Sequence, residues 1–526
     1  MKIRKYIFLL FLFYSYIPVL AQVDTAWVRR YNGPGNGDDV AVALAVDKDG
    51  NSYVAGWSYG NGTFEDYTTI KYASNGDTLW VRRYNGPGNG DDEPKALAVD
   101  ESGNVYVTGE SDTDTGMFKY NDDFVTIKYS SSGDVLWIKQ YNGSGNGDDN
   151  ARDIKVDRSG NVYVTGDSYG GVTAYDYTTI KYYPNGDTAW VRRYNGPGNS
   201  QDGAWAISVD GSGNVYVTGY SAQNSVYPYN EDYATVKYDQ NGNQLWVRRY
   251  NGPAGLEDYA SGMGLDGTGN IYVTGESRDS ISYDDYLTIK YYPNGDTAWI
   301  RRWDGPGNDD DDVWAIAVDS VGNVYLAGET EVAPLSPNYD FATIKYYASG
   351  EIAWVKTYGG PVHYGQANGI ALDSVGNVYV TGFSGGSGDF DYATIKYSPN
   401  GDSVWAIRYN GPGNSYDDAS AIIVDQAGYV YVTGESQGSG SSLDYATIKY
   451  KQCLAKPGDA NADGNILLPD IITIINFLFR SGAAPNPLCR GDANGNGNVL
   501  LPDIVYLINY IFKSGPAPLK SKECCL

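Results

Sequence analysis

The chain has few of the residues that build most zinc sites and nucleophilic catalytic sites. Among 526 residues it has one histidine and four cysteines, and all four cysteines lie at or after position 453. The long stretch before Cys453 therefore holds no cluster of His and Cys that could bind zinc. The single histidine, His363, stands in "GGPVHYG". We expect it to be an exposed loop residue rather than a metal ligand or a catalytic base.

Helix-like segments are missing where a serine hydrolase would need one. Gly-x-Ser-x-Gly sequences begin at residues 56, 166, 382 and 434. In a hydrolase this pattern joins a strand to a helix and exposes a nucleophilic serine. Here each copy follows a strand-like segment, and no helix-like segment comes next. We therefore interpret these serines as structural.

Basic charge and long apolar runs are also scarce. Lys and Arg number 38 against 64 Asp and Glu, for a formal net charge of -26 at pH 7. Such a surface repels phosphate backbones, which argues against nucleic acid as a partner. The strongly apolar run lies in "MKIRKYIFLLFLFYSYIPVLAQ", behind three basic residues and before a small-residue cleavage pattern. We expect residues 1–21 to be a signal peptide of a secreted or cell-surface protein that does not span the membrane.

Glycine and tyrosine are abundant, with 66 and 50 residues, and a four-part pattern repeats along the chain. Its first copy reads "DTAWVRRYNG", "DDVAVALAVD", "GNSYVAG" and "DYTTIKY". These segments are rich in β-branched and aromatic residues and are bounded by Gly, Asn, Pro and Asp, which is typical of strands and turns. One Trp marks each of the copies: Trp27, Trp80, Trp137, Trp190, Trp246, Trp299, Trp354 and Trp405.

Four strands in each copy predict an all-β fold, a β-propeller of eight four-stranded blades over residues 22–450. The "AVALAVD" segment is apolar almost throughout, so we place it innermost, and the Trp-bearing strand outermost. The pattern opens on a Trp strand at residues 24–31 and closes without one after Tyr450. The N-terminal strand is therefore expected to complete the last blade and close the ring.

The recurring "GNVYVTG" and the "AIAVD"-like segment before it resemble the signature of the SBBP-type bacterial β-propeller repeat, over roughly residues 24–450. The resemblance implies a propeller fold and no one activity.

Acidic turns such as "YNGPGNGDD", and "NDDDD" at 308–312, gather carboxylates at one rim of the predicted ring. Three interpretations stay open: residues that form turns well, rim Ca²⁺ sites, and acid–base catalysis on a glycan. Tyr and Trp at this density pack between blades or form a surface for sugars. We also expect Arg of the "WVRRY" strands to pair with Asp of the "DYATIKY" strands. No copy departs from the others in a chemically pointed way, so we predict no catalytic residue.

A different module follows, with a linker at 451–457, a domain at 458–518 and a Cys-containing tail at 519–526. "DANADGNILLPD" and "DANGNGNVLLPD" fit twelve-position calcium loops, with oxygen-bearing residues at positions 1, 3, 5, 7 and 12 and Gly at position 6. We predict one Ca²⁺ in each loop and weaker binding in the second, which has fewer carboxylates. The predicted ligands are Asp459, Asn461, Asp463, Asn465, Asp470, Asp492, Asn494, Asn496, Asn498 and Asp503.

Each loop leads into an apolar helical pattern that ends at Ser-Gly, and in the second copy Ile504, Leu507, Ile508 and Ile511 share one face. No helix is expected before either loop. The four cysteines, Cys453, Cys489, Cys524 and Cys525, suggest disulfides in this module, with the pairing left open.

Duplicated loop–helix units with Asp at position 12 resemble a type I dockerin, over residues 458–515. The resemblance implies two Ca²⁺ ions and docking onto a cohesin. Leu467 and Leu500 stand at position 9, and Leu-Pro replaces the Ser or Thr that dockerins often carry at positions 10 and 11 for cohesin recognition. The resemblance therefore supports calcium binding more strongly than it supports docking onto a cohesin.

The sequence as a whole predicts a secreted, non-catalytic propeller, held to a cohesin-like or cell-surface protein by a calcium-binding module. The alternative is a protein that binds or degrades polysaccharide at the rim or funnel of the propeller.

Overall fold

The computed structural model describes residues 23–113, 121–225, 230–278, 283–307, 309–332, 338–386, 389–452, 458–461, 465–485 and 488–519. The described residues fall into two compact units, Asp24–Gln452 and one that takes in the residues from 458 onward. The expected signal peptide, Asp463, Cys453, Cys524 and Cys525 lie outside the described residues. No helix in the described part of the chain is long and apolar enough to cross a membrane.

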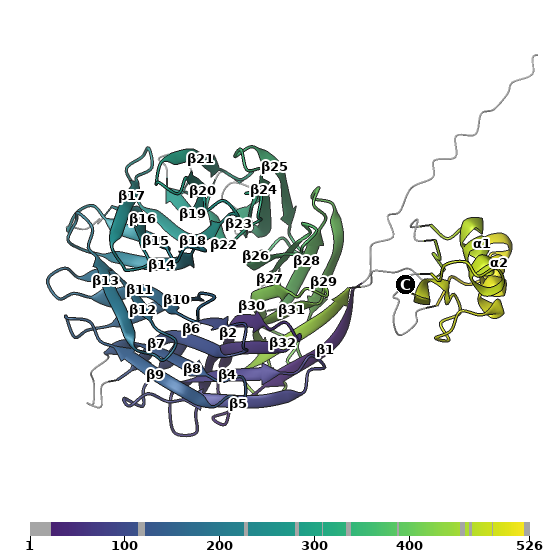
Figure 1. Cartoon of the computed structure of the whole chain (residues 1–526), viewed down its shortest axis with the longest axis horizontal. Coiled ribbons are helices and arrows are strands. Elements are labelled where there is room, and N and C mark those ends of the chain that lie inside the picture. The colour runs from purple at the N-terminus through teal and green to yellow at the C-terminus, as the bar shows by residue number, and fades with distance from the viewer. Residues whose placement is uncertain are drawn as a thin grey trace, which may run out of the picture. The chain divides into compact units, whose positions relative to one another are not determined.

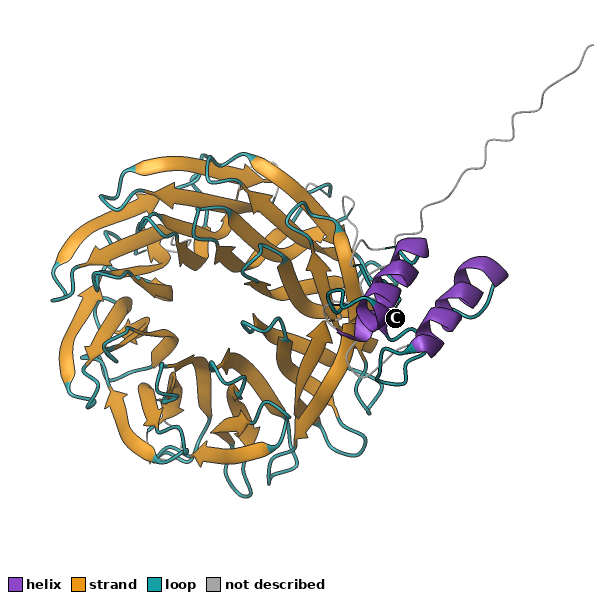
Figure 2. Ribbon diagram, turned by 45° about the vertical axis from the view of Figure 1, so that its right-hand side comes forward, coloured by secondary structure: helices purple, strands orange, loops and turns teal. Residues whose placement is uncertain are grey.

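The first unit has eight antiparallel four-stranded sheets, which confirms the predicted propeller. Figures 1 and 2 show that the sheets are arranged in a ring. The innermost strands are β2 (Asp39–Val46), β6 (Asp92–Val99), β10 (Asp149–Val156), β14 (Asp202–Val209), β18 (Asp258–Leu265), β22 (Asp311–Val318), β26 (Gly365–Leu372) and β30 (Asp417–Val424). The second strands are β3 (Ser52–Tyr59), β7 (Val105–Asp112), β11 (Val162–Tyr169), β15 (Val215–Ala222), β19 (Ile271–Arg278), β23 (Val324–Glu331), β27 (Val378–Gly386) and β31 (Val430–Gln437).

The two outer positions of each blade follow in the same order. The third strands are β4 (Glu65–Tyr72), β8 (Asp122–Tyr129), β12 (Tyr175–Tyr182), β16 (Glu231–Tyr238), β20 (Asp284–Tyr291), β24 (Tyr339–Tyr346), β28 (Asp389–Tyr397) and β32 (Leu443–Gln452). The outermost, Trp-bearing strands are β5 (Thr78–Tyr84), β9 (Val135–Tyr141), β13 (Thr188–Tyr194), β17 (Gln244–Tyr250), β21 (Thr297–Trp303), β25 (Ile352–Tyr358), β29 (Ser403–Tyr409) and β1 (Val23–Tyr31). We number the blades 1 to 8, beginning with β2.

The N-terminal strand closes the ring, as predicted. Blade 8 has the strand order β1-β32-β31-β30, so its outermost strand comes from the opposite end of the propeller sequence. Arg30 of β1 pairs with Asp444 of β32 at 2.8 Å. β32 runs on to Gln452, so this strand includes the first two residues of the segment that we expected to be a linker.

Aromatic and branched side chains hold neighbouring blades together. Tyr53 and Trp80 of blade 1 pack with Val105 and Val107 of blade 2 in one buried cluster. The indole Nε1 of Trp80 also donates to the carbonyl of Ser131 in blade 2, at 3.2 Å. Removal of these apolar surfaces from water drives the blades together, and the repeated Trp contact fixes their register.

The second unit contains two helices, α1 (Leu468–Phe479) and α2 (Leu501–Lys513). Ile471 and Ile474 of α1 pack against Ile504 and Leu507 of α2 around a small buried core. Ile508 and Ile511 pack against the same core, which confirms that the four apolar residues of α2 share one side of the helix. A single turn of 3-10 helix, η1 (Leu488–Gly491), precedes the second loop, where we expected no helix. Its Cys489 is disulfide-bonded.

Candidate functional site

The second calcium-like loop brings its first and last carboxylates into the interior of the C-terminal unit. Asp492 and Asp503 are both almost fully buried. The carboxylate of Asp492 accepts hydrogen bonds from the backbone N–H of Asn496 and of Gly497, at 3.0 and 2.7 Å. Burial, and then the nearby charge of Asp492, raises the pKa of Asp503 above its usual value.

The first loop repeats this arrangement where it is described. Asp470 accepts from the backbone N–H of Asn461 at 3.1 Å and of Leu467 at 2.8 Å. Asp503 accepts from the equivalent Asn494 and Leu500 at the same distances. The loop is thus tied to the helix that follows it through the carboxylate at position 12. Asp463 and Gly464 lie outside the described residues.

The donor set fits a hard cation. Calcium binds six to eight oxygens, and carboxylates from both ends of one loop are the ligands it prefers. In both copies the described carboxylates at positions 1 and 12, Asp459 with Asp470 and Asp492 with Asp503, are buried. In the first copy Arg490 also pairs with Asp459 at 2.6 Å and offsets part of its charge. Leu467 and Leu500, at position 9, bring no side-chain oxygen.

Large apolar side chains are exposed at matching positions of the two helical copies. Each side chain of the first copy has an apolar counterpart at the same place of the second copy, and all of them are about half exposed or more. The set, which we call the apolar face, is Leu467, Leu468, Ile472 and Phe479 with Leu500, Leu501, Val505 and Phe512. In most single surface helices such positions are polar.

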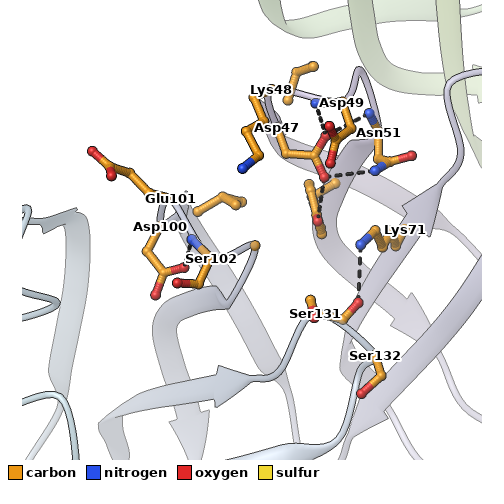
Figure 3. A pocket seen from close by; sticks show the side chains of 14 residues that line it. Asp47, Lys48, Asp49, Asn51, Lys71, Asp100, Glu101, Ser102, Ser131 and Ser132 are labelled. Atoms are coloured by element: carbon orange, nitrogen blue, oxygen red, sulfur yellow. Dashed lines mark hydrogen bonds between the residues drawn. The ribbon is translucent and has the colours of Figure 1, made fainter.

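In the propeller, the end that carries the hairpin turns between the innermost and second strands is alike from blade to blade. A cleft of about 760 Å³ lies there between blades 1 and 2 (Figure 3). Asp47 accepts from the backbone N–H groups of Asp49 and Asn51 and from the hydroxyl of Tyr53. Lys71 donates to the carbonyl of Ser131 at 3.1 Å. Because these groups hold the turn and the blade junction, we assign the repeated cleft a structural role.

The second Asp of each "GDD" turn is buried rather than displayed on the rim. Asp39 accepts from the backbone N–H of Gly33 at 2.6 Å and is fully buried. Burial raises the pKa of Asp39 to about 6, against hydrogen bonds from Ser58 and Gly33 that lower it. The same position is buried in seven blades: Asp39, Asp92, Asp149, Asp202, Asp258, Asp311 and Asp417. Each of them accepts a hydrogen bond from the backbone N–H of a glycine in the same turn, so we assign these carboxylates a structural role.

The Gly-x-Ser-x-Gly serines and the "WVRRY" arginines belong to the same network. Arg83 donates to Ser58 at 2.6 Å and to Asp66 at 2.7 Å, which confirms the expected pairing of the third and outermost strands. Ser58 and Asp66 are both buried. A buried serine hydrogen-bonded to arginine is a structural residue and not a nucleophile.

Blade 6 departs from this pattern, which the sequence reasoning missed. Thr357 stands where most blades carry the paired Arg, and His363 fills the gap, with its Nδ1 3.2 Å from Asp340. His363 is well exposed, as predicted, and has a left-handed backbone. Thr357 in the Trp-bearing segment was the signal for this departure.

At the opposite end of the propeller, one pair of residues differs in every blade. It joins the second residue of each innermost strand to the second strand, and the eight pairs are Val40–Trp57, Glu93–Glu110, Asn150–Asp167, Gly203–Tyr220, Tyr259–Glu276, Asp312–Glu329, Gln366–Phe383 and Asp418–Glu435. The very next pair keeps Gly on the second strand in all eight blades. We call this end the variable end.

A β-bulge follows in every innermost strand, after the third residue. A bulge re-aims a side chain and is common next to functional sites. The bulged residues also differ: Val42, Lys95, Arg152, Trp205, Ser261, Trp314, Asn368 and Ser420. Trp205 and Trp314 are 44% and 48% exposed, whereas the Trp side chains of the outermost strands pack between blades.

Carboxylates converge at the variable end between blades 5 and 6. Oxygens of Glu276, Asp284 and Asp312 lie within 4.8 Å of one another. Burial, followed by the charges of Asp312 and Asp284, raises the pKa of Glu276 to about 8. Burial, followed by the charge of Asp312, raises the pKa of Glu329 to about 8 as well. A carboxyl group with a pKa near neutral exchanges between a protonated form that donates hydrogen bonds and an ionised form that accepts them.

Comparisons with known proteins agree with the ring of blades. Residues 26–62, 79–114, 136–171 and 354–391 match the model of the family described as "Beta-propeller repeat", SBBP. With its eight sheets, the chain is a β-propeller repeat protein.

One relative is an uncharacterised WD repeat-containing protein of Acanthamoeba polyphaga mimivirus, 24% identical over 480 residues. The match takes in 76% of this chain and only 33% of that protein, so the chain spans about a third of its length.

Among solved structures, the polysaccharide lyase Uly1 has 13% identity and a TM-score of 0.43, covering 82% of this chain and 99% of that one. The propeller domain of the Trilobed protease from Pyrococcus furiosus has 9% identity and a TM-score of 0.40, with 68% and 94% covered. Nothing about function follows from likeness at this level.

Proposed function

We propose that this chain is a secreted, non-catalytic propeller that binds or organises other molecules and is attached to a protein partner by its C-terminal unit. Two loops of that unit bind Ca²⁺. The observation that carries the proposal is the duplication itself: both copies keep buried carboxylates at positions 1 and 12, and both keep apolar residues exposed at equal places. Loss of one feature in one copy would be expected if neither had a role.

Calcium would hold each loop against the helix that follows. In the first loop, oxygens of Asp459, Asn461, Asp463 and Asp470 and the carbonyl of Asn465 would surround the ion. In the second, Asp492, Asn494, Asn496 and Asp503 and the carbonyl of Asn498 would do so. The ion supplies positive charge for carboxylates that the fold has removed from water, and this favours the folded unit.

The apolar face supports the choice of partner. A cohesin-like or cell-surface protein with an apolar counter-surface would cover Leu468 and Leu501, which replace the hydroxyl residues that dockerins often use for recognition. Burial of a Leu side chain at a protein interface contributes on the order of 1–3 kcal/mol. The leader sequence, together with the disulfide at Cys489, supports export, because disulfides persist in oxidising compartments.

Calcium-dependent stability tests this proposal. Differential scanning calorimetry of the chain from residue 22 onward should resolve the unfolding of the C-terminal unit from that of the propeller. Calcium at a hundredfold excess over its Kd should stabilise the C-terminal unit by about 2.7 kcal/mol per site, relative to EGTA, and leave the propeller transition in place. The double variant Asp470→Asn with Asp503→Asn should lose the shift.

The matched control is Asp49→Asn, at an exposed hairpin turn of the propeller. It should keep the calcium shift. If the C-terminal unit unfolds at the same temperature in Ca²⁺ and in EGTA, the proposal that calcium stabilises an attachment module is contradicted.

A second candidate function is the binding or breakdown of polysaccharide by the propeller. The observation that favours it is the variable end, where exposed Trp side chains and protonatable carboxylates gather at positions that change in every blade.

A further inference from the structure

The two exposed bulge tryptophans stand on innermost strands that have one blade between them. Trp205 belongs to β14 of blade 4, and Trp314 to β22 of blade 6. Neighbouring innermost strands are in contact all around the ring, so residues exposed on them face its centre or its mouth. The bulge residue of blade 5, Ser261, is small and donates to the carbonyl of Val313 in blade 6, at 3.0 Å. The blade between the two tryptophans therefore carries a small side chain at its bulge.

Both indoles are held by neighbours. The guanidinium of Arg152, the bulge residue of blade 3, lies over the ring of Trp205 with 5.0 Å between its carbon and the ring centroid. Arg152 is fixed in turn by Asp167 at 3.3 Å. Trp314 lies close enough to the carboxyl group of Glu329 to oppose the rise of its pKa that burial causes. Fixed aromatic rings lose little entropy when a ligand binds them.

Aromatic and carboxylic side chains lie at the two blade junctions between Trp205 and Trp314. The rings of Tyr220 and Tyr259 meet across the junction of blades 4 and 5, with centroids 5.3 Å apart. Gly203 allows this, because a Cβ there would lie 2.5 Å from the ring of Tyr220. Glu276 and Asp312 follow at the junction of blades 5 and 6. The variable end of blades 4 to 6 thus presents aromatic platforms at both sides and oxygen ligands for hydroxyl groups in the middle.

We propose that this part of the variable end binds a neutral carbohydrate chain, whose sugar rings stack on Trp205 and Trp314 and whose hydroxyl groups hydrogen-bond Glu276, Asp312 and Glu329. The proposal refines the second candidate function and is independent of the C-terminal unit. Sugar rings present C–H faces that pack on aromatic rings, and hydroxyls that both donate to and accept from carboxyl groups. In this proposal Trp205 and Trp314 bind the carbohydrate and take no part in catalysis.

The charge of the chain selects among carbohydrates. An anionic polymer would meet carboxylates at the site and a formal net charge of -26 over the whole chain. A compact apolar ligand would need an enclosed apolar pocket, whereas these indoles are nearly half exposed. A neutral chain of sugars meets neither obstacle.

Native affinity electrophoresis of the chain from residue 22 onward tests the proposal. The gels contain xylan, mixed-linkage β-glucan, galactomannan or, as the anionic comparison, alginate, all with EGTA so that the loops of the C-terminal unit are free of calcium. At least one neutral gel should retard the protein. The variants Trp205→Ala and Trp314→Ala should each raise the Kd by roughly tenfold, as expected for an aromatic anchor, and the Phe variants should lose less.

The matched control is Tyr292→Ala, an exposed aromatic residue at the repeated end of the ring. It should leave retardation unchanged, and the circular dichroism spectra of all variants should agree. Three results overturn the proposal: no retardation in any neutral gel, stronger retardation in alginate, or retardation that both Ala variants retain. The last result would keep a carbohydrate-binding propeller and reject this site. Failure of the site is therefore distinguishable from failure of the second candidate function.

Discussion

The second Asp of each "GDD" turn shows how far a residue's role depends on its place in the fold. From the sequence these aspartates looked like part of an acidic rim. In the structure their carboxylates are buried and accept a hydrogen bond from the backbone N–H of a glycine, as Asp92 does from Gly86 at 2.6 Å. Composition could not reveal this, because a turn-forming Asp and a displayed Asp have the same neighbours in sequence.

These buried aspartates predict how the stability of the propeller depends on pH. Burial raises the pKa from 3.8 to about 6 in Asp39, Asp149, Asp202 and Asp258, and to about 7 in Asp92 and Asp311. Between the unfolded and folded values the native state binds more protons, so the free energy of unfolding should rise as the pH falls from about 7 toward 4. The melting temperature of the propeller transition should be higher at pH 5 than at pH 8.

Another set of aspartates limits how far the pH can fall before the propeller loses stability. Although burial opposes it, hydrogen bonds from Asn51 and Tyr53 lower the pKa of Asp47, and the equivalent turn residues Asp100, Asp210, Asp266 and Asp373 shift the same way. The stability they contribute is present above pH 3.8 and is lost as the pH falls through their folded pKa values. A melting temperature that rises steadily from pH 5 to pH 8 would contradict the assignment of the buried set.

Strands were the level at which the sequence was most informative. Trp recurrence and the four repeated segments predicted the blades, their strand order and the closure by β1, and the structure confirms each. The bulges were not predictable in the same way. "AVALAVD" and its relatives read as continuous strands, and a single extra residue leaves no mark in an apolar run. Without the bulges, neither the exposure of Trp205 nor that of Trp314 follows from the sequence.

The glycine that follows the variable pair explains why only some strand positions vary. A Cβ at Gly166 of β11 would lie 1.9 Å from the backbone oxygen of Asn150, which cannot move without breaking the pair of strands. The equivalent glycines Gly56 and Gly219 have the same close contact. The repeat therefore keeps glycine here, while the adjacent pair, which is second from the end of the innermost strand, changes from blade to blade.

This contact makes a direct prediction. Gly166→Ala should destabilise the propeller by about 1–3 kcal/mol, the usual effect of forcing extra volume into a packed interior. The control is Gly211→Ala, where an added Cβ would meet no atom within 4 Å. Urea denaturation followed by tryptophan fluorescence compares the two. Equal midpoints for both variants would show that the strands adjust at no cost.

For the whole molecule, the division into a propeller and a C-terminal unit followed from the sequence, because the pattern of strands stops where the loops of Asp, Asn and Gly begin. The variable end could not be assigned in advance. Its residues come from strands of eight repeats, and they gather only once the register of each pair is known. Repetition identified the fold, and the departures from repetition identify the surface where a ligand is expected.

The apolar face of the C-terminal unit is inferred from similarity between copies, whereas the variable end is inferred from differences between blades. Here it is the agreement between copies that carries information, since Leu468 with Leu501 and Ile472 with Val505 are exposed and yet stay apolar. Attachment through this face would need a C-terminal unit with a stable shape, and we propose that calcium supplies this stability.

The count of bound calcium ions tests the central claim most directly. Equilibrium dialysis of the chain from residue 22 onward against Ca²⁺ should find two ions, one tightly held and one more weakly held. Asp470→Asn should remove the tight site and leave the weak one, and Asp503→Asn should do the reverse, because each carboxylate closes a different loop. A chain that binds no Ca²⁺, or one whose count is unchanged in both variants, would contradict a calcium-held attachment unit.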